Sequence, residues 1–342
     1  MLKILGSVIV FAVLSFFLIC SCNSSSNSGE GKLKQKIIKV SYDDPVDFAS
    51  EIHLTAWIFQ KYINDNSKTL EVKLYGSGSL GHEREVYEAM QLGSGASCVI
   101  SGTAILNNFS PRTGVLDLSF LWKDFDHVHR VLDSEVGNIL ADDLDKVGIK
   151  VLGWLDSWGY RNIITAKKEI KSPQDIKGLK IRTIQTPFNI AALNAMGANA
   201  TPMAFGEIYS SMQTGVLDGF EHNATIVNTK KFYEVGKYMA LTKHLFGPMV
   251  ICFSKKQWDE LSTEDQKIVQ EAATLARDIQ RALAPIRESE AMMLLKEHGM
   301  IINEINRTPF LKSAKEMQNT LAQQVGAENL LQKIRNAELT GN

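Results

Sequence analysis

The sequence predicts an α/β fold with two domains. Apolar runs of strand length recur along the chain, each beside a segment with helical spacing, and this alternation predicts parallel sheets with crossover helices. The 342 residues are enough for two domains of ordinary size. A long helical pattern in the last quarter is the third observation. The predicted strands are KIIKVSY at 36–42, LEVKLY at 70–75, ASCVIS at 96–101, IKVLGW at 149–154, LKIRTI at 179–184 and MVICFS at 249–254.

Helices are predicted between these strands from the spacing of apolar residues. A longer helix is predicted from Ser262, which forms a capping-box pattern with Asp265, towards Leu295. Pro285 is expected to kink it, because proline removes a donor and clashes with the preceding turn. A helix of about 30 residues is as long as a domain, so it is able to brace two lobes. The shorter predicted helices are 50–65, 82–92, 126–147, 187–197 and 205–216.

The start of the chain predicts where the protein works. Lys3 is followed by an uncharged apolar run up to Cys20, which is typical of a bacterial lipoprotein signal peptide over residues 1–21. Cys22 is the expected lipidation site, because Cys20 follows the bulky Ile19. Residues 22–35 then form a lipid-anchored flexible tether. The alternative is a membrane-spanning anchor, for which the run is marginally short.

Composition excludes some partners. A formal charge of −1 provides no basic excess for binding nucleic acid. Apolar and charged fractions of 44% and 22% are those of a soluble globular protein. Cys98 and Cys252 lie in apolar, strand-like runs, which favours two buried thiols over a disulfide.

A glycine motif, G-x-G-x-x-G at Gly76, Gly78 and Gly81, lies between a predicted strand and a predicted helix. That layout is found in dinucleotide-binding turns, which also need an acidic residue roughly 20 positions further on. No Asp or Glu occurs from Ala89 to Leu116. We therefore expect a tight turn that leads into the helix beginning near His82, and no nucleotide cofactor.

Catalytic motifs are missing from the sequence. It contains no G-x-S-x-G, H-E-x-x-H or C-x-x-C. His127 and His129 are separated by one residue and face opposite ways on a helix, so we expect solvent-facing side chains and no metal. The sequence thus favours a protein that is not an enzyme. An exported hydrolase is the alternative, and it would need a nucleophile with its base.

Two arginines are the strongest candidates for binding. Arg182 lies near the end of the strand KIRTI, on the same face as Lys180, and Arg161 follows LDSWGY at the predicted exit of a strand. Two guanidinium groups in one cleft are suited to holding a carboxylate, because arginine keeps its charge and offers a planar fork of donors. The alternative for either residue is an ordinary salt bridge.

Five segments carry a family resemblance: LYGSGSLG, GLKIR, TPMAFGEIY, QTGVLDGFE and KFYEVGKY. In this order they resemble the extracytoplasmic solute-binding subunits of tripartite ATP-independent periplasmic (TRAP) transporters, the DctP family, from about Ile37 to Asn329. The resemblance implies a class II periplasmic-binding-protein-like fold, with two lobes joined by crossing hinge strands and braced by a long helix. Residues 36–158 plus 248–287 are expected to form lobe I, and 159–247 plus 288–342 lobe II.

The resemblance also implies roles for residues. Arg182 matches the arginine that pairs with the ligand carboxylate, and Arg161 a second arginine that assists it. Phe205 matches an aromatic residue beside the ligand, and His222 a polar residue, often Asn, that hydrogen-bonds the carboxylate or a neighbouring group. The N-terminal loop aligns poorly, which leaves Asp43, Glu51 and His53 without assigned roles.

The chemistry of the candidate site favours a sugar acid. Gln185, Ser101, Asn223 and His222 offer donors and acceptors for several hydroxyls, which suits a hexuronate or an aldonate. A C4-dicarboxylate or keto acid is the alternative, and a dicarboxylate needs a second cation. Sialic acid is disfavoured, because some relatives that bind it have an acidic residue at the position of Ser101.

The expected partners follow from the resemblance. They are the small and large membrane subunits of an ion-coupled TRAP transporter, to which a monomeric, lipid-anchored binding protein delivers its ligand outside the cytoplasm. A sensory binding protein that serves a kinase or chemoreceptor would have the same sequence features.

Lipidation can be tested in cells. We expect a fatty-acid probe to label the wild-type protein and not a Cys22→Ser variant, because the thioether-forming sulfur is lost. A gel of immunoprecipitated protein measures the label. A Cys22→Ser variant that still carries the probe would contradict the lipoprotein prediction.

Overall fold

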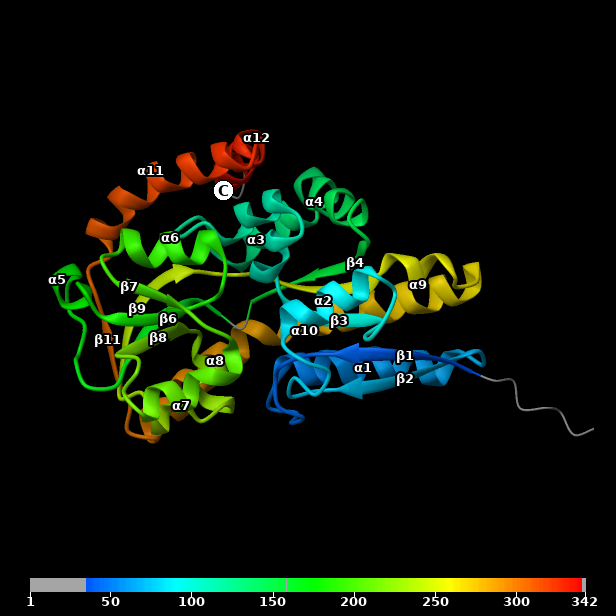
Figure 1. Cartoon of the computed structure of the whole chain (residues 1–342), viewed down its shortest axis with the longest axis horizontal. Coiled ribbons are helices and arrows are strands. Elements are labelled where there is room, and N and C mark those ends of the chain that lie inside the picture. The colour runs from blue at the N-terminus through cyan, green and yellow to red at the C-terminus, as the bar shows by residue number, and fades with distance from the viewer. Residues whose placement is uncertain (1–34, 158, 340–342) are drawn as a thin grey trace, which may run out of the picture. The chain divides into compact units, whose positions relative to one another are not determined.

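The computed structural model describes residues 35–157 and 159–339. These residues form one compact unit (Figure 1). The predicted signal peptide, Cys22 and all but the last residue of the predicted tether lie outside the described residues.

Lobe I is built on a five-stranded sheet of order β2-β1-β3-β10-β4. Strand β1 is parallel to β2 and β3, whereas β10 is antiparallel to both β3 and β4. The strands are β1 Lys36–Ser41, β2 Leu70–Tyr75, β3 Cys98–Gly102, β4 Ile149–Leu155 and β10 Met249–Ser254.

Lobe II is built on a six-stranded sheet of order β11-β9-β5-β8-β6-β7. Strands β6, β7 and β8 are parallel, and β5 is antiparallel to both β8 and β9. The strands are β5 Arg161–Thr165, β6 Lys180–Thr183, β7 Asn199–Pro202, β8 Gly219–His222, β9 Tyr238–Leu245 and β11 Ile301–Glu304.

Parallel pairs are present in both sheets, as predicted, but both sheets also contain antiparallel pairs. The chain crosses between the sheets three times, the last time from β10 to β11 by way of α9 (Lys255–Asp259) and α10 (Thr263–Glu297). It first passes from β4 to β5 through 156–160 and returns from β9 to β10 through 246–248. In each sheet the strands that begin or end these first two crossings pair antiparallel with a neighbour. The resemblance had implied these crossing strands, and the two-lobed fold is confirmed (Figure 1).

The glycine motif forms the predicted turn between β2 and α2. Backbone φ is +67° at Gly78 and +121° at Gly81, a region that favours glycine. A Cβ at Gly76 would lie 2.6 Å from the Tyr42 ring. The turn leads directly into α2, which spans Glu83–Gln91.

The predicted long helix is α10, Thr263–Glu297, and its N-cap Ser262 accepts a hydrogen bond from Asp265 N. Helix α10 packs against α1 (Glu51–Asn66) and β4 of lobe I, and against α8 (Ala224–Thr229) of lobe II. It therefore braces both lobes. Pro285 lies inside α10 and does not end it; the predicted kink stays a prediction.

The predicted helix 126–147 is two helices, α3 (Phe125–Leu132) and α4 (Glu135–Asp145), because Ser134 caps α4 by accepting from Val136 N. The segment 205–216 begins as a 3₁₀ turn, η3 Phe205–Glu207, before α7. The other helices are α5 Pro173–Ile176, α6 Pro187–Ala195, α7 Ile208–Gln213, α9 Lys255–Asp259, α11 Thr308–Gln324 and α12 Glu328–Leu339, with 3₁₀ turns η1 Ala104–Asn108, η2 Pro111–Asp117 and η4 Phe232–Glu234.

Strand β10 and all but the last residue of β3 are buried, so the centre of the lobe I sheet is covered on both faces. Cys98 pairs with Phe253 across β3 and β10, and Cys252 pairs with Val99, so the two thiols point to opposite faces of the sheet. Both cysteines are buried and free, as predicted. Helix α12 packs against α3 and α4, so the end of the segment assigned to lobe II lies on lobe I.

No helix within residues 35–157 and 159–339 combines the length and apolarity needed to cross a bilayer.

Candidate functional site

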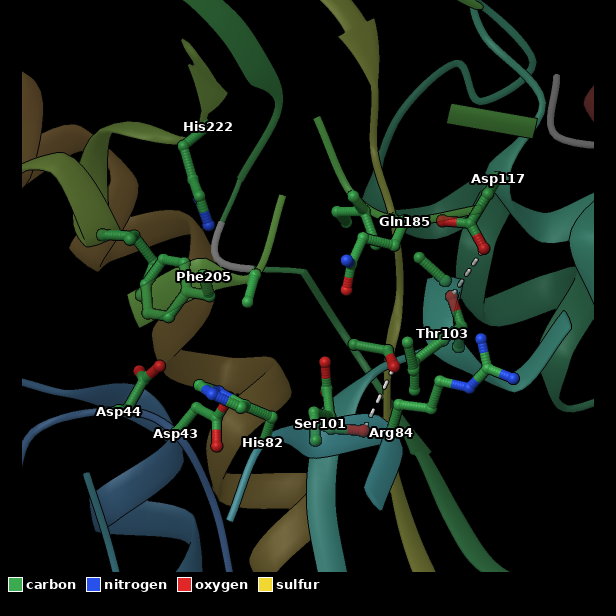
Figure 2. A pocket seen from close by; sticks show the side chains of 18 of the residues that line it. Asp43, Asp44, His82, Arg84, Ser101, Thr103, Asp117, Gln185, Phe205 and His222 are labelled. Atoms are coloured by element: carbon green, nitrogen blue, oxygen red, sulfur yellow. Dashed lines mark hydrogen bonds between the residues drawn. The ribbon is translucent and has the colours of Figure 1, made fainter. Parts of the chain in front are cut away.

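A pocket lies between the two sheets, and residues of both lobes line it. In Figure 2, Phe205, His222 and Gln185 of lobe II lie opposite Asp43, Asp44, His82 and Ser101 of lobe I. Six of the seven predicted ligand-binding residues line this pocket: Ser101, Arg161, Arg182, Gln185, Phe205 and His222.

Arg182 occupies the third position of β6, between β7 and β8. Its neighbour Ile181 faces the lobe II core, so the alternation of the strand directs Arg182 to the pocket side. The residue is 3% exposed, and its Nε donates to Met203 O at 2.9 Å. Burial lowers the pKa of Arg182 to about 10, which keeps it charged at neutral pH.

The two terminal nitrogens of Arg182 make no hydrogen bond within the described part of the chain. The planar end of this guanidinium is therefore available to a ligand carboxylate, which it can hold through two parallel hydrogen bonds.

Arg161 is differently placed from the prediction. It opens β5 instead of following the exit of a strand, and its Nε and Nη2 donate to the two carboxylate oxygens of Glu221. Nη2 lies 2.8 Å from Glu221 Oε1 and 3.0 Å from Glu221 O. The charge of Arg161 is thus largely balanced inside the protein, and among the described residues only its Nη1 has no hydrogen-bond partner.

Glu221 is the most important residue that the sequence reasoning missed. It is fully buried in β8, accepts from Thr183 Oγ1 at 3.2 Å, and lies 3.8 Å from His244 Nε2. Its position in QTGVLDGFE was a signal, because a carboxylate inside a matched motif and beside two arginines has a cation to pair with.

His222 and Phe205 form one wall of the pocket, with ring centroids 5.5 Å apart. His222 Nδ1 accepts from Asn223 N at 3.1 Å, which leaves the imidazole proton on Nε2. Burial and the nearby Arg161 and Arg182 hold the pKa of His222 well below its ordinary value. His222 is therefore a neutral donor, suited to a hydroxyl or carboxylate oxygen.

Asn223 does not line the pocket. It caps α8, where its Oδ1 accepts from Ile226 N at 2.9 Å. Ser101 lines the pocket, but its hydroxyl exchanges a 2.8 Å hydrogen bond with Tyr87 OH and donates to Gly102 O. Gln185, between β6 and α6, is exposed at the pocket.

Carboxyl groups line the lobe I side, and the sequence reasoning assigned none of them. Burial raises the pKa of Asp43, raises that of Glu83 to about 8, and raises that of Asp117 to about 7. Thr103 donates to Asp117 (Figure 2). Such groups can donate or accept hydrogen bonds, so this side suits hydroxyls better than a second anion.

The unassigned loop residues have different positions. Asp43 lines the pocket, whereas His53 and Glu51 do not. His53 Nδ1 shares a 2.6 Å hydrogen bond with Tyr42 OH. Glu51 is buried at the start of α1 and accepts from Gln280 Nε2 of α10 at 2.9 Å.

The prediction that both helix histidines face solvent is wrong for His127. It is buried, and its Nε2 lies 2.8 Å from Ile334 O, because α12 covers α3. His129 Nε2 lies 2.7 Å from Asp156 Oδ1. Within the described ranges, no group of three or more His, Cys, Asp or Glu side chains is arranged to hold a metal ion.

Comparison with known proteins identifies the family. The model of bacterial extracellular solute-binding protein family 7, DctP, matches residues 48–329, and the chain belongs to this family. It contains the solute-binding proteins of TRAP transporters, which work outside the cytoplasm. The chain is 34% identical over 260 residues to the 2,3-diketo-L-gulonate-binding periplasmic protein YiaO of Escherichia coli, covering 75% of this chain and 79% of YiaO.

Two solved structures are similar throughout. The sugar acid binding protein DctPAm of Advenella mimigardefordensis, in complex with galactonate, has a TM-score of 0.84 at 29% identity over 89% of this chain and 99% of that one. A TRAP solute-binding protein of Sulfitobacter, with bound β-D-galacturonate, has a TM-score of 0.82 at 30% identity over 88% and 100%.

Glu51 generates a prediction about pH. Burial raises its pKa from 4.5 to about 8, so from about pH 4.5 to 8 the folded protein keeps a proton that the unfolded chain has released. Glu51 therefore lowers the free energy of unfolding as the pH rises, by up to about 1.4 kcal/mol per unit. We expect Glu51→Gln to raise Tm at pH 8 and to flatten this decline.

Thermal denaturation at pH 5 and pH 8 measures the effect. The exposed Glu316→Gln is the matched control and should leave the difference between the two pH values unchanged. A Glu51→Gln variant with the wild-type pH dependence would show that Glu51 is ionised in the folded protein.

Proposed function

We propose that the protein captures a sugar acid, a hexuronate or an aldonate, and delivers it to an ion-coupled TRAP transporter. The observation that carries the proposal is the buried guanidinium of Arg182, whose unoccupied planar end faces a pocket that is lined on its other side by carboxyl groups. A ligand that satisfies both sides has one carboxylate and several hydroxyls. The galactonate and galacturonate bound by the similar structures have this chemistry.

The proposed contacts assign one task to each side chain. Arg182 pairs with the ligand carboxylate, and Arg161 assists through Nη1 while Glu221 holds its other side. Phe205 packs against the carbon skeleton, and His222 donates from Nε2. Gln185 forms a hydrogen bond with a ligand hydroxyl.

A C4-dicarboxylate is the second candidate, because Arg84 and His82 also line the pocket and either is able to meet a second anion. Asp43, Asp44 and Glu83 lie on the same side and would repel that anion when ionised. Arg84 is moreover exposed and donates to Glu88 at 2.9 Å. These contacts favour a monocarboxylate with hydroxyls.

In this proposal the protein binds and delivers its ligand and does not catalyse a reaction. A monomer anchored through lipid on Cys22 would hold the ligand between closed lobes and present it to the small and large membrane subunits. The family membership supports the transport role.

A thermal-shift screen against uronates, aldonates, dicarboxylates and keto acids tests the proposed ligand class. We expect the largest rise in Tm with a hexuronate or aldonate, and we expect Arg182→Ala to abolish the rise. Charge-assisted hydrogen bonds contribute roughly 1.5–3 kcal/mol each, so loss of a bidentate pair lowers affinity at least a hundredfold. Arg182→Lys should also weaken binding, because lysine offers no planar fork.

The matched control is Arg277→Ala, which removes an arginine of α10 that forms an ion pair with the exposed Asp278. It should keep the full ligand-dependent shift. A full shift in Arg182→Ala would remove the carboxylate-binding role, and a dominant response to succinate or malate would replace the sugar acid with the dicarboxylate.

A further inference from the structure

A single lysine joins the two lobes beside the pocket. Lys230 is the C-cap of α8 in lobe II, and its Nζ donates to Asp43 O at 2.9 Å. Asp43 follows β1 in lobe I, 187 positions earlier in the chain. The donor and the acceptor therefore belong to different lobes.

The acceptor is held in place on lobe I. The carbonyls on either side of Asp43 bind the glycine turn, since Gly78 N donates to Tyr42 O at 3.1 Å and Ser77 N donates to Asp44 O at 2.9 Å. Asp44 Oδ2 also accepts from Ser50 Oγ at 2.8 Å. Asp43 O accepts from Lys230 instead, so it is directed away from the turn and towards lobe II.

The donor is equally well placed on lobe II. Lys230 N donates to Ile226 O at 3.0 Å, and the next residue, Lys231, adopts a left-handed conformation with φ +54°, so the chain turns at this point. The ammonium of Lys230 lies 5.1 Å from the centre of the Phe205 ring, within the range of a cation–π contact. Phe205 lines the pocket and Lys230 does not.

Charge supports the same geometry. Asp44 and Asp43 both favour the charged form of Lys230 and oppose the effect of burial, which lowers its pKa. An ammonium that crosses to lobe I thus meets acceptors and negative charge there.

We propose that Lys230 is a latch between the lobes, which forms when they close and slows release of the ligand. The proposal rests on the proposed binding function. Opening moves Asp43 O away from lobe II, so the contact is made only in the closed form and shifts the population towards it. Because Phe205 contacts both the latch and the pocket, a ligand that holds this ring in place also holds the latch.

The test is Lys230→Met, which keeps an unbranched side chain of similar length and removes its charge. Lys231→Met is the matched control, because it removes the same charge from an adjacent, exposed position. Spin labels at the exposed Lys68 of lobe I and Gln174 of lobe II report the distance between the lobes. Distances are measured without ligand and with D-galacturonate, and stopped-flow measurements give the rate of release.

We expect Lys230→Met to lower the closed fraction and to speed release by roughly tenfold, the loss of about one charge-assisted hydrogen bond. Lys231→Met should behave like the wild type. Lys230→Arg keeps the charge, so its closed fraction and its rate of release should lie between those of the wild type and Lys230→Met. If Lys230→Met gives the same distance distributions as the wild type, both with and without ligand, the latch proposal is overturned. If galacturonate changes no distance distribution, it is not the ligand and the proposed function fails in that respect. The comparison of the wild type with Lys230→Met in the absence of ligand then still tests the latch.

Discussion

The structure depends on keeping one guanidinium charged inside the protein. Arg182 is nearly inaccessible to solvent, and a buried cation without a partner costs several kcal/mol. Met203 O satisfies only its Nε. Its ionised state is supported by Glu221, the largest opposing influence on its pKa, although the carboxylate of Glu221 is itself bound by Arg161. This cluster therefore has a net positive charge, and a ligand carboxylate completes it.

The two-lobed fold allows that charge to be covered and uncovered. The crossing segments 156–160 and 246–248 and the helix α10 connect the lobes. The cation lies on lobe II, while the carboxyl groups of Asp43 and Glu83 lie on lobe I. A ligand with an anionic end and a hydroxyl-bearing remainder gains contacts with both lobes only when they approach, so binding favours the closed form to the extent that it binds that form better.

Much of this fold could be predicted from the sequence, because burial of one face leaves an alternating apolar run, as in β2, and burial of both faces leaves a continuous one, as in β10. Strands β1, β2 and β10 lie where those runs indicated, and α10 begins at its predicted cap. The antiparallel pairing of β5 and β9 could not be predicted from the sequence, since strand direction depends on where the chain crosses between the sheets. The split between α3 and α4 depends on the capping serine, a local signal that the apolar spacing hid.

The site was predictable where a side chain belongs to a matched motif, as with Arg182, Phe205 and His222. The site was not predictable where the role of a side chain depends on a neighbour that is close in space but distant in the sequence. Arg161 was expected to bind ligand with its whole fork, but Glu221 occupies most of it. Asn223 caps a helix because it precedes α8, and His127 is buried because α12 covers it. Such partners lie 60 and 207 positions away for Arg161 and His127, beyond any local pattern.

The most direct measurement is a crystal structure of the complex with the acid that gives the largest thermal shift. The account predicts that both carboxylate oxygens accept from the terminal nitrogens of Arg182 at about 2.7–2.9 Å, with the hydroxyls directed towards Asp43 and Glu83. A bound ligand whose carboxylate lies elsewhere, with the guanidinium of Arg182 turned out of the pocket, would contradict it.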